Sequence, residues 1–344
     1  MKVAVIGATG AVGREMIRIL QERRFPVDEL VLLASSRSAG LRVAFGGDEH
    51  EVRELTVEAA RGADVAFVSA GASVSKAVLP EIAAGGTVCI DNSSAFRMDP
   101  AVPLSVPAVN PEALEGWPHP GIIAVPNCTT ITAVLALGPL HRAATCTSLV
   151  LSSYQAVSGA GWKGTGELAE QVDKLGGDIE SLARPDHDAL PQGEVFAKPI
   201  AFNVVAKIGE FEADGFTGEE AKMMAEPRKI LSAPDMRVVA TSVRVPVVTG
   251  HAVSMLAEFS RALSVSEARE LLDVAPGVRL MDDPEAGIFP SPLDAAGGDD
   301  ALVGRIRQVP GRDDALVLFS CADNVRKGAA LDAVEIAEHL FTTR

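Results

Sequence analysis

The sequence predicts an α/β protein whose N-terminal domain is a Rossmann-type, doubly wound parallel sheet and whose second domain is α+β. The apolar run at residues 1–6 leads into a glycine-rich turn and then into an amphipathic helix over 14–22. Apolar runs at 29–34, 65–69 and 87–91 are continuous rather than alternating, as in parallel strands buried on both faces. Strands that alternate with helices in this way predict a doubly wound sheet.

The pattern changes beyond residue 145, where longer β-rich runs are separated by helices and loops, which indicates an α+β domain. The segment 323–342 reads as a last amphipathic helix that could return to the first domain. The segment 284–300 is rich in Pro, Gly and Asp and predicts a long surface loop. The β-rich runs lie at 148–155, 237–248, 254–259 and 315–322.

Composition excludes several classes of protein. The chain has 344 residues, 47% of them hydrophobic, and a formal net charge of −15, so it lacks the basic surplus that binding to nucleic acid needs. No stretch of about eighteen uninterrupted apolar residues predicts a membrane span, and the N-terminus enters a strand directly without the pattern of a secretion signal. The four cysteines form no CxxC pair or disulfide-dense pattern, which favours a reducing, cytoplasmic location and predicts no metal site.

The glycines Gly7, Gly10 and Gly13 stand between the first strand and the first helix. Glycines at this place allow a tight turn and a close approach to a pyrophosphate, which the helix N-terminus attracts. A turn that serves only as a bend is the alternative.

The end of the second strand distinguishes between nicotinamide cofactors. It carries no acidic residue to hold a ribose 2′-hydroxyl, and instead Arg37 and Ser38 follow it. An arginine and a hydroxyl suit a 2′-phosphate, so the sequence favours NADP. The alternative is an arginine that is merely solvated.

Cys128 is the candidate nucleophile. It lies in VPNCTTI, directly before a helix-like stretch at 132–141. A helix N-terminus lowers the pKa of a thiol, and its N–H groups can stabilise an oxyanion. Cys89, Cys146 and Cys321 lie in strand-like apolar runs and are expected to be inert.

An acid/base partner must come from elsewhere in the chain. His251 follows a glycine at the end of a β-rich run, so its ring could be exposed on a turn, although a histidine in such a place is usually structural or solvated. Arg244, seven residues earlier, could bind a carboxylate through two hydrogen bonds.

Together these pieces resemble the aspartate-semialdehyde dehydrogenase family over nearly the whole chain. Eight blocks in order carry the resemblance: GATGAVG (7–13), SSRSAG (35–40), DNSSAFR (91–97), VPNCTTI (125–131), SYQAVSGAG (153–161), RVPVVTGH (244–251), VGRIR (303–307) and DNVRKGAAL (323–331).

The resemblance implies a reaction and a role for each matching residue. The family reduces L-aspartyl 4-phosphate to L-aspartate 4-semialdehyde, reversibly and with NADPH, through a cysteine thioester, in the biosynthesis of lysine, threonine and methionine. It implies Cys128 as nucleophile, with Asn127 beside it, His251 as acid/base and Gln155 as an orienting residue. The implied substrate contacts are Arg244 for the α-carboxylate, Arg97 and Lys222 for phosphate, and Glu219 or Glu220 for the amino group, of which Glu219 shares a helical face with the lysine. The implied cofactor contacts are Gly7, Thr9, Gly10, Ala11, Val12, Gly13, Arg37, Ser38, Ser158, Gly159 and Asn324.

The same resemblance implies an organisation and leaves two rivals. Residues 1–128 with 324–344 would form the NADP-binding domain, and 129–323 would form a catalytic domain that also makes a homodimer. The nearest rival is an N-acetyl-glutamyl-phosphate reductase, which shares the architecture but usually differs around the cysteine. The other rival is a catalytically inactive relative that keeps the fold, against which the retained site residues argue.

Overall fold

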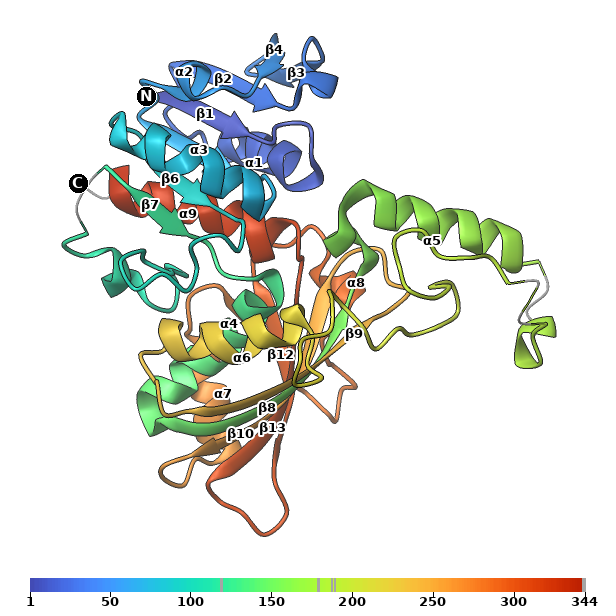
Figure 1. The fold of residues 1–344 in the computed structure, drawn as a ribbon. Helices are drawn as coiled ribbons and strands as arrows, with labels where there is room; N and C mark the ends of the chain where they lie inside the picture. The colour runs from blue at the N-terminus through green and yellow to red at the C-terminus, as the bar shows by residue number, and fades with distance from the viewer. Residues whose placement is uncertain (118–119, 178–179, 187, 189, 342–344) are drawn as a thin grey trace. The chain divides into compact units, whose positions relative to one another are not determined.

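The chain forms two compact units. The computed structural model, drawn in Figure 1, describes residues 1–117, 120–177, 180–186, 188 and 190–341. The first unit comprises Met1–Gly138, Ala225–Pro234 and Val325–Arg344, and the second comprises Pro139–Met224 and Asp235–Asn324. This division differs from the boundary expected at residue 128, because helix α4 (Cys128–Ala144) continues the first unit as far as Gly138. It also assigns to the first unit a segment, Ala225–Pro234, that the sequence reading gave to the second.

The first unit is built on a seven-stranded sheet with the order β3-β4-β2-β1-β5-β6-β7. All neighbouring strands pair in parallel except β3, which is antiparallel to β4. The prediction of a doubly wound parallel sheet is therefore confirmed, and the order of the six parallel strands is that of dinucleotide-binding sheets, with its switch point between β1 and β5. The strands are β1 (Lys2–Ile6), β2 (Glu29–Ala34), β3 (Arg42–Phe45), β4 (Asp48–Glu54), β5 (Val65–Val68), β6 (Val88–Asp91) and β7 (Ile122–Ala124).

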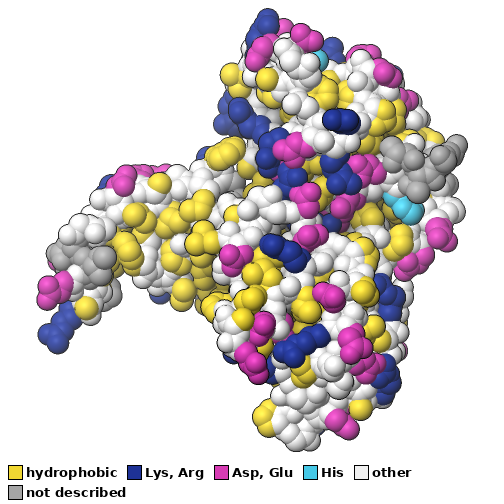
Figure 2. All heavy atoms as spheres, turned by 180° about the vertical axis from the view of Figure 1, so that it is seen from behind, with side chains coloured by type: hydrophobic (Ala, Val, Ile, Leu, Met, Phe, Trp, Pro, Cys, Tyr) yellow, Lys and Arg dark blue, Asp and Glu magenta, His cyan; other side chains and the backbone are white. Residues whose placement is uncertain are grey.

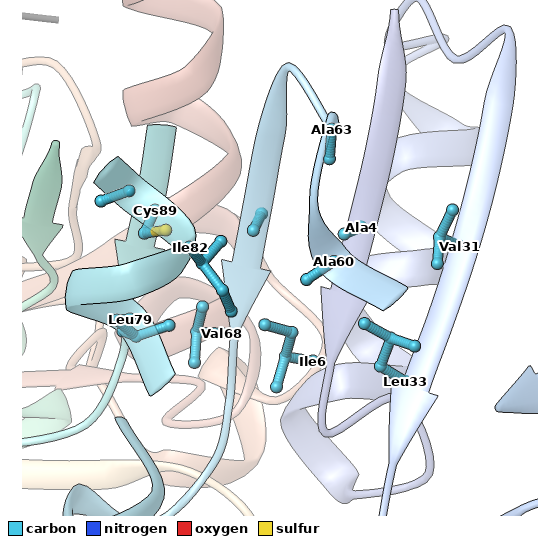
Figure 3. Packing of buried hydrophobic residues seen from close by; sticks show 12 residues of the cluster. Ala4, Ile6, Val31, Leu33, Ala60, Ala63, Val68, Leu79, Ile82 and Cys89 are labelled. Carbon is cyan, nitrogen blue, oxygen red and sulfur yellow. The ribbon is translucent and has the colours of Figure 1, made fainter. Parts of the chain in front are cut away.

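Helices cover both faces of this sheet, which explains why its central strands are apolar throughout. Helices α1 and α9 pack together and against β5 on one face, while α2 and α3 pack together, against β2 and β6, on the other. Figure 3 shows the second of these layers, in which Ile6 and Val68 from the strands lie against Leu79 and Ile82 of α3. The helices are α1 (Ala11–Glu22), α2 (Val57–Ala60), α3 (Ala72–Ala84) and α9 (Leu331–Phe341).

The turn between β1 and α1 requires glycine at two positions. Gly7 has a φ of +85°, and a Cβ there would lie 2.1 Å from the carbonyl oxygen of Ser69. A Cβ on Gly13 would lie 2.1 Å from the carbonyl oxygen of Gly7. The first turn of α1 therefore packs directly on the loop, as the glycine spacing predicted.

The second unit is built on a mixed six-stranded sheet with the order β11-β12-β13-β10-β8-β9. Most of its pairs are antiparallel, with β8 parallel to β9 and β11 parallel to β12. This arrangement confirms the predicted α+β domain. The strands are β8 (Cys146–Gln155), β9 (Arg237–Arg244), β10 (His251–Phe259), β11 (Val278–Leu280), β12 (Ala301–Gln308) and β13 (Ala315–Ala322).

The remaining helices complete the two units. The expected surface loop at 284–300 contains one helical turn, α8 (Pro292–Ala295), and the expected terminal helix opens with a π-helical turn, η5 (Arg326–Ala330), before α9. Helix α9 returns to the first unit, where Glu338 forms an ion pair with Arg23, the residue directly after α1. The others are α5 (Gly161–Leu175), α6 (Gly218–Ile230) and α7 (Val265–Asp273).

The surface carries mixed charge. On the face seen in Figure 2, Lys and Arg side chains are interspersed with Asp and Glu, and no broad basic area forms. No helix among the described residues is long and apolar enough to cross a membrane. Within the same part of the chain, no three His, Cys, Asp or Glu side chains gather as metal ligands.

Candidate active site

Cys128 is the first residue of helix α4, as the sequence predicted. Its side chain is half-buried, whereas Cys89, Cys146 and Cys321 are buried. Burial raises the pKa of each of these three thiols to about 12, so they stay protonated and inert near neutral pH. Cys128 is thus the cysteine whose position suits a nucleophile.

Asn127 caps the helix that begins with the nucleophile. Its Oδ1 accepts hydrogen bonds from the backbone N–H groups of Thr129, at 2.9 Å, and Thr130, at 3.3 Å. These bonds use two of the donors that we expected to stabilise an oxyanion, so donors elsewhere in the site must contribute to that role. The cap also determines the orientation of the Asn127 amide: Oδ1 is the acceptor of these bonds, and Nδ2 is the donor atom of the side chain.

Arg97 follows β6 and is buried, with 7% of its surface exposed. Its Nε donates to the carbonyl oxygen of Val125 at 2.9 Å and its Nη2 to that of Asn92 at 2.7 Å. Its Nη1 donates to Oε1 of Glu226 at 3.0 Å. The candidate phosphate ligand is therefore held rigidly beside the strand that leads to the nucleophile.

Glu226 is a residue that the sequence reading missed. It is 1% exposed, and its Oε2 accepts the backbone N–H of Asn127 at 2.7 Å. Its carboxylate thus joins the candidate phosphate ligand to the residue before the nucleophile. Its spacing on α6, seven residues after Glu219 and four after Lys222, was the available signal, because these positions share one helical face.

In the second unit, three predicted substrate residues form one hydrogen-bonded group. Nε2 of Gln155, at the end of β8, donates to Oε1 of Glu219 at 3.2 Å. The other carboxylate oxygen of Glu219 accepts from Nζ of Lys222 at 3.1 Å. Glu219 is buried and Lys222 is partly exposed. The group presents an amide, a carboxylate and an ammonium from two elements.

Glu220, the alternative to Glu219, has a structural environment. Its carboxylate accepts the backbone N–H of Thr217 at 2.8 Å and that of Ser242 at 2.9 Å. The Thr217 hydroxyl in turn accepts from the N–H of Glu220, which makes a reciprocal cap at the start of α6. The contacts therefore favour Glu219 as the substrate residue.

His251 is buried at the start of β10, so the expectation of a ring exposed on a turn was wrong. Gly250, at a φ of +101°, turns the chain directly into the strand and brings the ring against the loop after β8. Nδ1 of the ring accepts the backbone N–H of Ala156 at 3.0 Å, so the neutral ring carries its proton on Nε2. Burial, and then the nearby Arg244, lower the pKa of His251 well below its usual value.

Nε2 of His251 is a buried donor with no hydrogen-bond partner among the described residues. An unmet buried donor costs about 1–3 kcal/mol, so its retention calls for an explanation. The neighbouring position is Gly159, where a Cβ would lie 3.1 Å from this nitrogen. The lack of a side chain at Gly159 keeps space beside the donor, as expected where a ligand approaches.

Arg244, the last residue of β9, contacts the same loop after β8 as the histidine does. Its Nη1 donates to the carbonyl oxygen of Ala156 at 2.6 Å, and its guanidinium lies 5.7 Å from the ring centre of Phe196. Arg244 and Gly159 line a cavity of about 500 Å³, together with Phe196 and Lys207. A buried guanidinium that faces a cavity of this size suits a carboxylate of a small ligand.

The predicted cofactor residues of the first unit lie at the carboxyl ends of β1 and β2. Gly10 precedes α1 with no side-chain cap, and Ala11 and Val12 form its first turn, so backbone donors of the helix start face the loop. Oγ1 of Thr9 donates to Oγ of Ser38 at 3.3 Å, which joins the glycine loop to the end of β2. Arg37 is exposed beside it. These residues suit a dinucleotide pyrophosphate and a 2′-phosphate.

The predicted cofactor residues of the second unit also lie together. Nδ2 of Asn324 donates to Oγ of Ser158 at 2.9 Å, and Oδ1 of Asn324 accepts the N–H of Gly250 at 2.9 Å. Asn324 therefore links the loop that carries Ser158 and Gly159 to the residue before His251.

Comparison with known proteins places these residues in a family context. The model of the semialdehyde dehydrogenase NAD binding domain matches residues 2–117, and that of the semialdehyde dehydrogenase dimerisation domain matches residues 137–327. The aspartate-semialdehyde dehydrogenase of Aquifex aeolicus is 46% identical over 340 residues, which cover 98% of this chain and 97% of that protein. That of Streptomyces akiyoshiensis is 48% identical over 342 residues and 98% of each chain.

Solved structures agree with this relationship. The crystal structure of aspartate semialdehyde dehydrogenase II from Vibrio cholerae matches with a TM-score of 0.91 at 40% identity, over 99% of this chain and 98% of that one. A second structure of that protein, complexed with ASA, matches equally well. The similarity extends over both units of the chain.

The buried neutral state of His251 predicts a dependence of stability on pH. Its pKa is lowered in the folded protein, so the unfolded chain binds the proton more readily. The free energy of unfolding therefore decreases as the pH falls below about 6.5, the usual pKa of histidine, by at most about 1.4 kcal/mol per pH unit. The variant His251→Gln keeps an acceptor for Ala156 but cannot titrate. Urea denaturation between pH 5 and 8 should show a smaller loss at low pH for the variant than for the wild type, and equal losses would contradict the assignment.

Proposed function

The chain belongs to the aspartate-semialdehyde dehydrogenase family, and we propose that it reduces L-aspartyl 4-phosphate to L-aspartate 4-semialdehyde with NADPH, reversibly, through a thioester on Cys128. The observation that carries the proposal is the position of Cys128, half-buried at the start of α4, while the other three cysteines are buried. A thiolate is the reactive form of cysteine, and a helix N-terminus favours it.

In the proposed reaction, the Cys128 thiolate attacks the acyl carbon of the aspartyl phosphate. The bond from this carbon to the phosphate oxygen breaks, phosphate leaves with the electron pair, and a thioester remains. Arg97 and Lys222 are proposed to bind the phosphate, and the Nδ2 donor of Asn127 to stabilise the oxyanion. Arg244 binds the α-carboxylate, while Glu219, oriented by Gln155, binds the amino group.

NADPH, when bound, supplies a hydride to the acyl carbon of the thioester. The resulting thiohemiacetal collapses to the aldehyde, and the sulfur departs from carbon. We propose that His251 acts on this step through its Nε2–H, since a hydrogen bond from that group would stabilise the developing negative charge. We propose that His251 is the acid/base of this step and that Nε2 is the atom that exchanges a proton with the departing sulfur.

The assay that tests the function uses aspartate semialdehyde, phosphate and NADP, run beside acetylglutamate semialdehyde. We expect NADPH formation with the first substrate alone. Cys128→Ala should reduce this rate by at least about 10⁴-fold, since the covalent route is lost, while binding of NADPH measured by fluorescence remains within twofold. Substantial turnover by the variant would exclude Cys128 as the nucleophile, and turnover of acetylglutamate semialdehyde would favour the other reductase.

We propose NADP as the preferred cofactor. The support is the sequence after β2, where Arg37 and Ser38 stand and no acidic residue ends the strand. Gly7 and Gly13 keep the glycine loop free of side chains. Ser158 and Asn324, which are hydrogen-bonded to each other in the second unit, are proposed as further cofactor contacts.

Substitution of Arg37 tests the preference. Arg37→Ala should raise the KM for NADP about tenfold or more, because a charge-assisted contact to phosphate is worth about 1.5–3 kcal/mol, while leaving the KM for NAD within twofold. Arg42→Ala, at an exposed arginine on the edge strand β3, is the matched control. An equal effect of Arg37→Ala on both cofactors would show that this side chain does not read the 2′-phosphate.

We further propose that the chain is a homodimer in the cytoplasm. Its dimer surface would be the face of the second sheet that carries Val150, Tyr154 and Val239, which are 46%, 40% and 49% exposed. Apolar side chains grouped on an open sheet favour burial against a partner. The free state of all four cysteines accords with a reducing compartment, and cell fractionation that recovers the protein outside the cytoplasm would contradict this location.

A charge on the open face should disrupt the dimer. Val239→Lys places an ammonium on the proposed interface, beside Val150, where burial without a partner costs several kcal/mol. Sedimentation velocity should give a dimer for the wild type and a monomer for the variant at micromolar concentration. A wild-type monomer, or an unchanged dimer in the variant, would rule out this surface.

A further inference from the structure

We propose that Glu226 is a positioning residue for the phosphate step: its buried carboxylate aims the Arg97 guanidinium and fixes the backbone in front of Cys128. The inference rests on the function proposed above and assigns to the site a residue outside the sequence motifs. It is drawn from contacts inside the first unit alone.

The two oxygens of Glu226 serve two different loops. Oε1 accepts from Nη1 of Arg97 at 3.0 Å, and Oε2 accepts the backbone N–H of Asn127 at 2.7 Å. Only 1% of Glu226 is exposed, so both bonds lie in a poorly solvated environment where they are strong and directional. A single carboxylate therefore sets the distance between the phosphate ligand and the nucleophile loop.

The bonds of Arg97 leave a defined pair of donors. A guanidinium has five N–H hydrogens, and the carbonyl oxygens of Val125 and Asn92 use one on Nε and one on Nη2, while Glu226 uses one on Nη1. One N–H on each terminal nitrogen has no partner among the described residues. N–H groups of a guanidinium are suited to charge-assisted hydrogen bonds with phosphate oxygens.

Lys229, three residues after Glu226 on α6, holds the backbone of the same loop. Its Nζ donates to the carbonyl oxygens of Arg97 at 2.8 Å, Asp99 at 2.6 Å and Val102 at 2.8 Å. Desolvation lowers the pKa of this ammonium, which is partly buried. The last turns of α6 thus fix both the main chain and the side chain of Arg97.

Positioning and simple electrostatics predict opposite effects when the carboxylate is neutralised. A negative charge beside Arg97 opposes the binding of phosphate, so its removal should strengthen binding if charge alone mattered. If Glu226 acts by orientation, its removal lets the guanidinium turn and the Asn127 loop shift, and phosphate binding becomes weaker. A misplacement of about 1 Å can cost about 10²-fold in rate.

The test measures steady-state constants in the phosphate-consuming direction, with aspartate semialdehyde, NADP and varied inorganic phosphate. We expect Glu226→Gln to raise the KM for phosphate about tenfold and to lower kcat, with the KM values for aspartate semialdehyde and NADP within twofold of wild type. Glu226→Asp keeps the charge and should recover part of the loss. Circular dichroism and thermal melting verify folding, and if the Gln variant does not fold, the Asp variant carries the same comparison with a smaller rise.

Glu338→Gln is the matched control, because it removes an acid–arginine pair, with Arg23, from the surface of the same unit; it should leave all constants within twofold. A KM for phosphate that falls or stays constant in the Glu226 variants would overturn the inference, as would an equal rise in all three KM values. A wild-type protein with no phosphate-dependent turnover would instead contradict the proposed function, so the two failures are distinguishable.

Discussion

The start of helix α4 depends on the satisfaction of its backbone donors, and this requirement shapes the surroundings of Cys128. The first N–H groups of a helix have no partner within the helix. Here the side chain of Asn127 accepts two of them, and Glu226 accepts the N–H of Asn127 itself. Each such group left unmet in a buried place costs about 1–3 kcal/mol. The loop is therefore held in one conformation before any ligand binds.

In the second unit, hydrogen bonds to the backbone of Ala156 likewise orient the side chains of the site. The N–H of Ala156 donates to Nδ1 of His251, and its carbonyl oxygen accepts from Nη1 of Arg244. The two side chains that we assign to proton transfer and to carboxylate binding are thus oriented by opposite ends of a single residue. Gln155, the residue before Ala156 and the last of β8, donates to Glu219, so two adjacent residues contact three of the candidate site side chains. A motif of few residues can therefore specify most of this half of the site.

The sequence predicted those features that depend on local pattern. The glycine spacing, the continuous apolar strands and the helix that begins at Cys128 follow from periodicity and close packing, and the structure has them. The antiparallel strand β3 was missed because its side chains alternate at an exposed edge, without the apolar run that marks a buried strand. The burial of His251 was missed because it depends on the loop after β8, almost a hundred residues earlier in the chain.

Glu226 could not be identified from pattern for the same reason. In the sequence it is one acidic residue among several on a helix, and such residues are usually solvated. Its burial is decided by Arg97 and Asn127, which lie 129 and 99 positions away along the chain. Periodicity places it on the face of α6 that carries Glu219 and Lys222, but only the tertiary contacts distinguish a bridge from a surface charge.

The candidate anion ligands share a further property, which explains how a chain with a net charge of −15 could bind anionic substrates. Arg97 is paired with Glu226, Lys222 with Glu219, and Arg244 donates to a carbonyl oxygen. Two of these three cations are thus paired with carboxylates, which weakens any broad positive field around the ligands, and Figure 2 shows none on the face it displays. Recognition must then rest on the direction of individual N–H groups, which short-range hydrogen bonds set and which salt screens weakly. A site of fixed geometry also favours small anions whose oxygens match its N–H groups. A polyanion without that shape would gain little binding energy, because the cations of the site are already hydrogen-bonded to other groups.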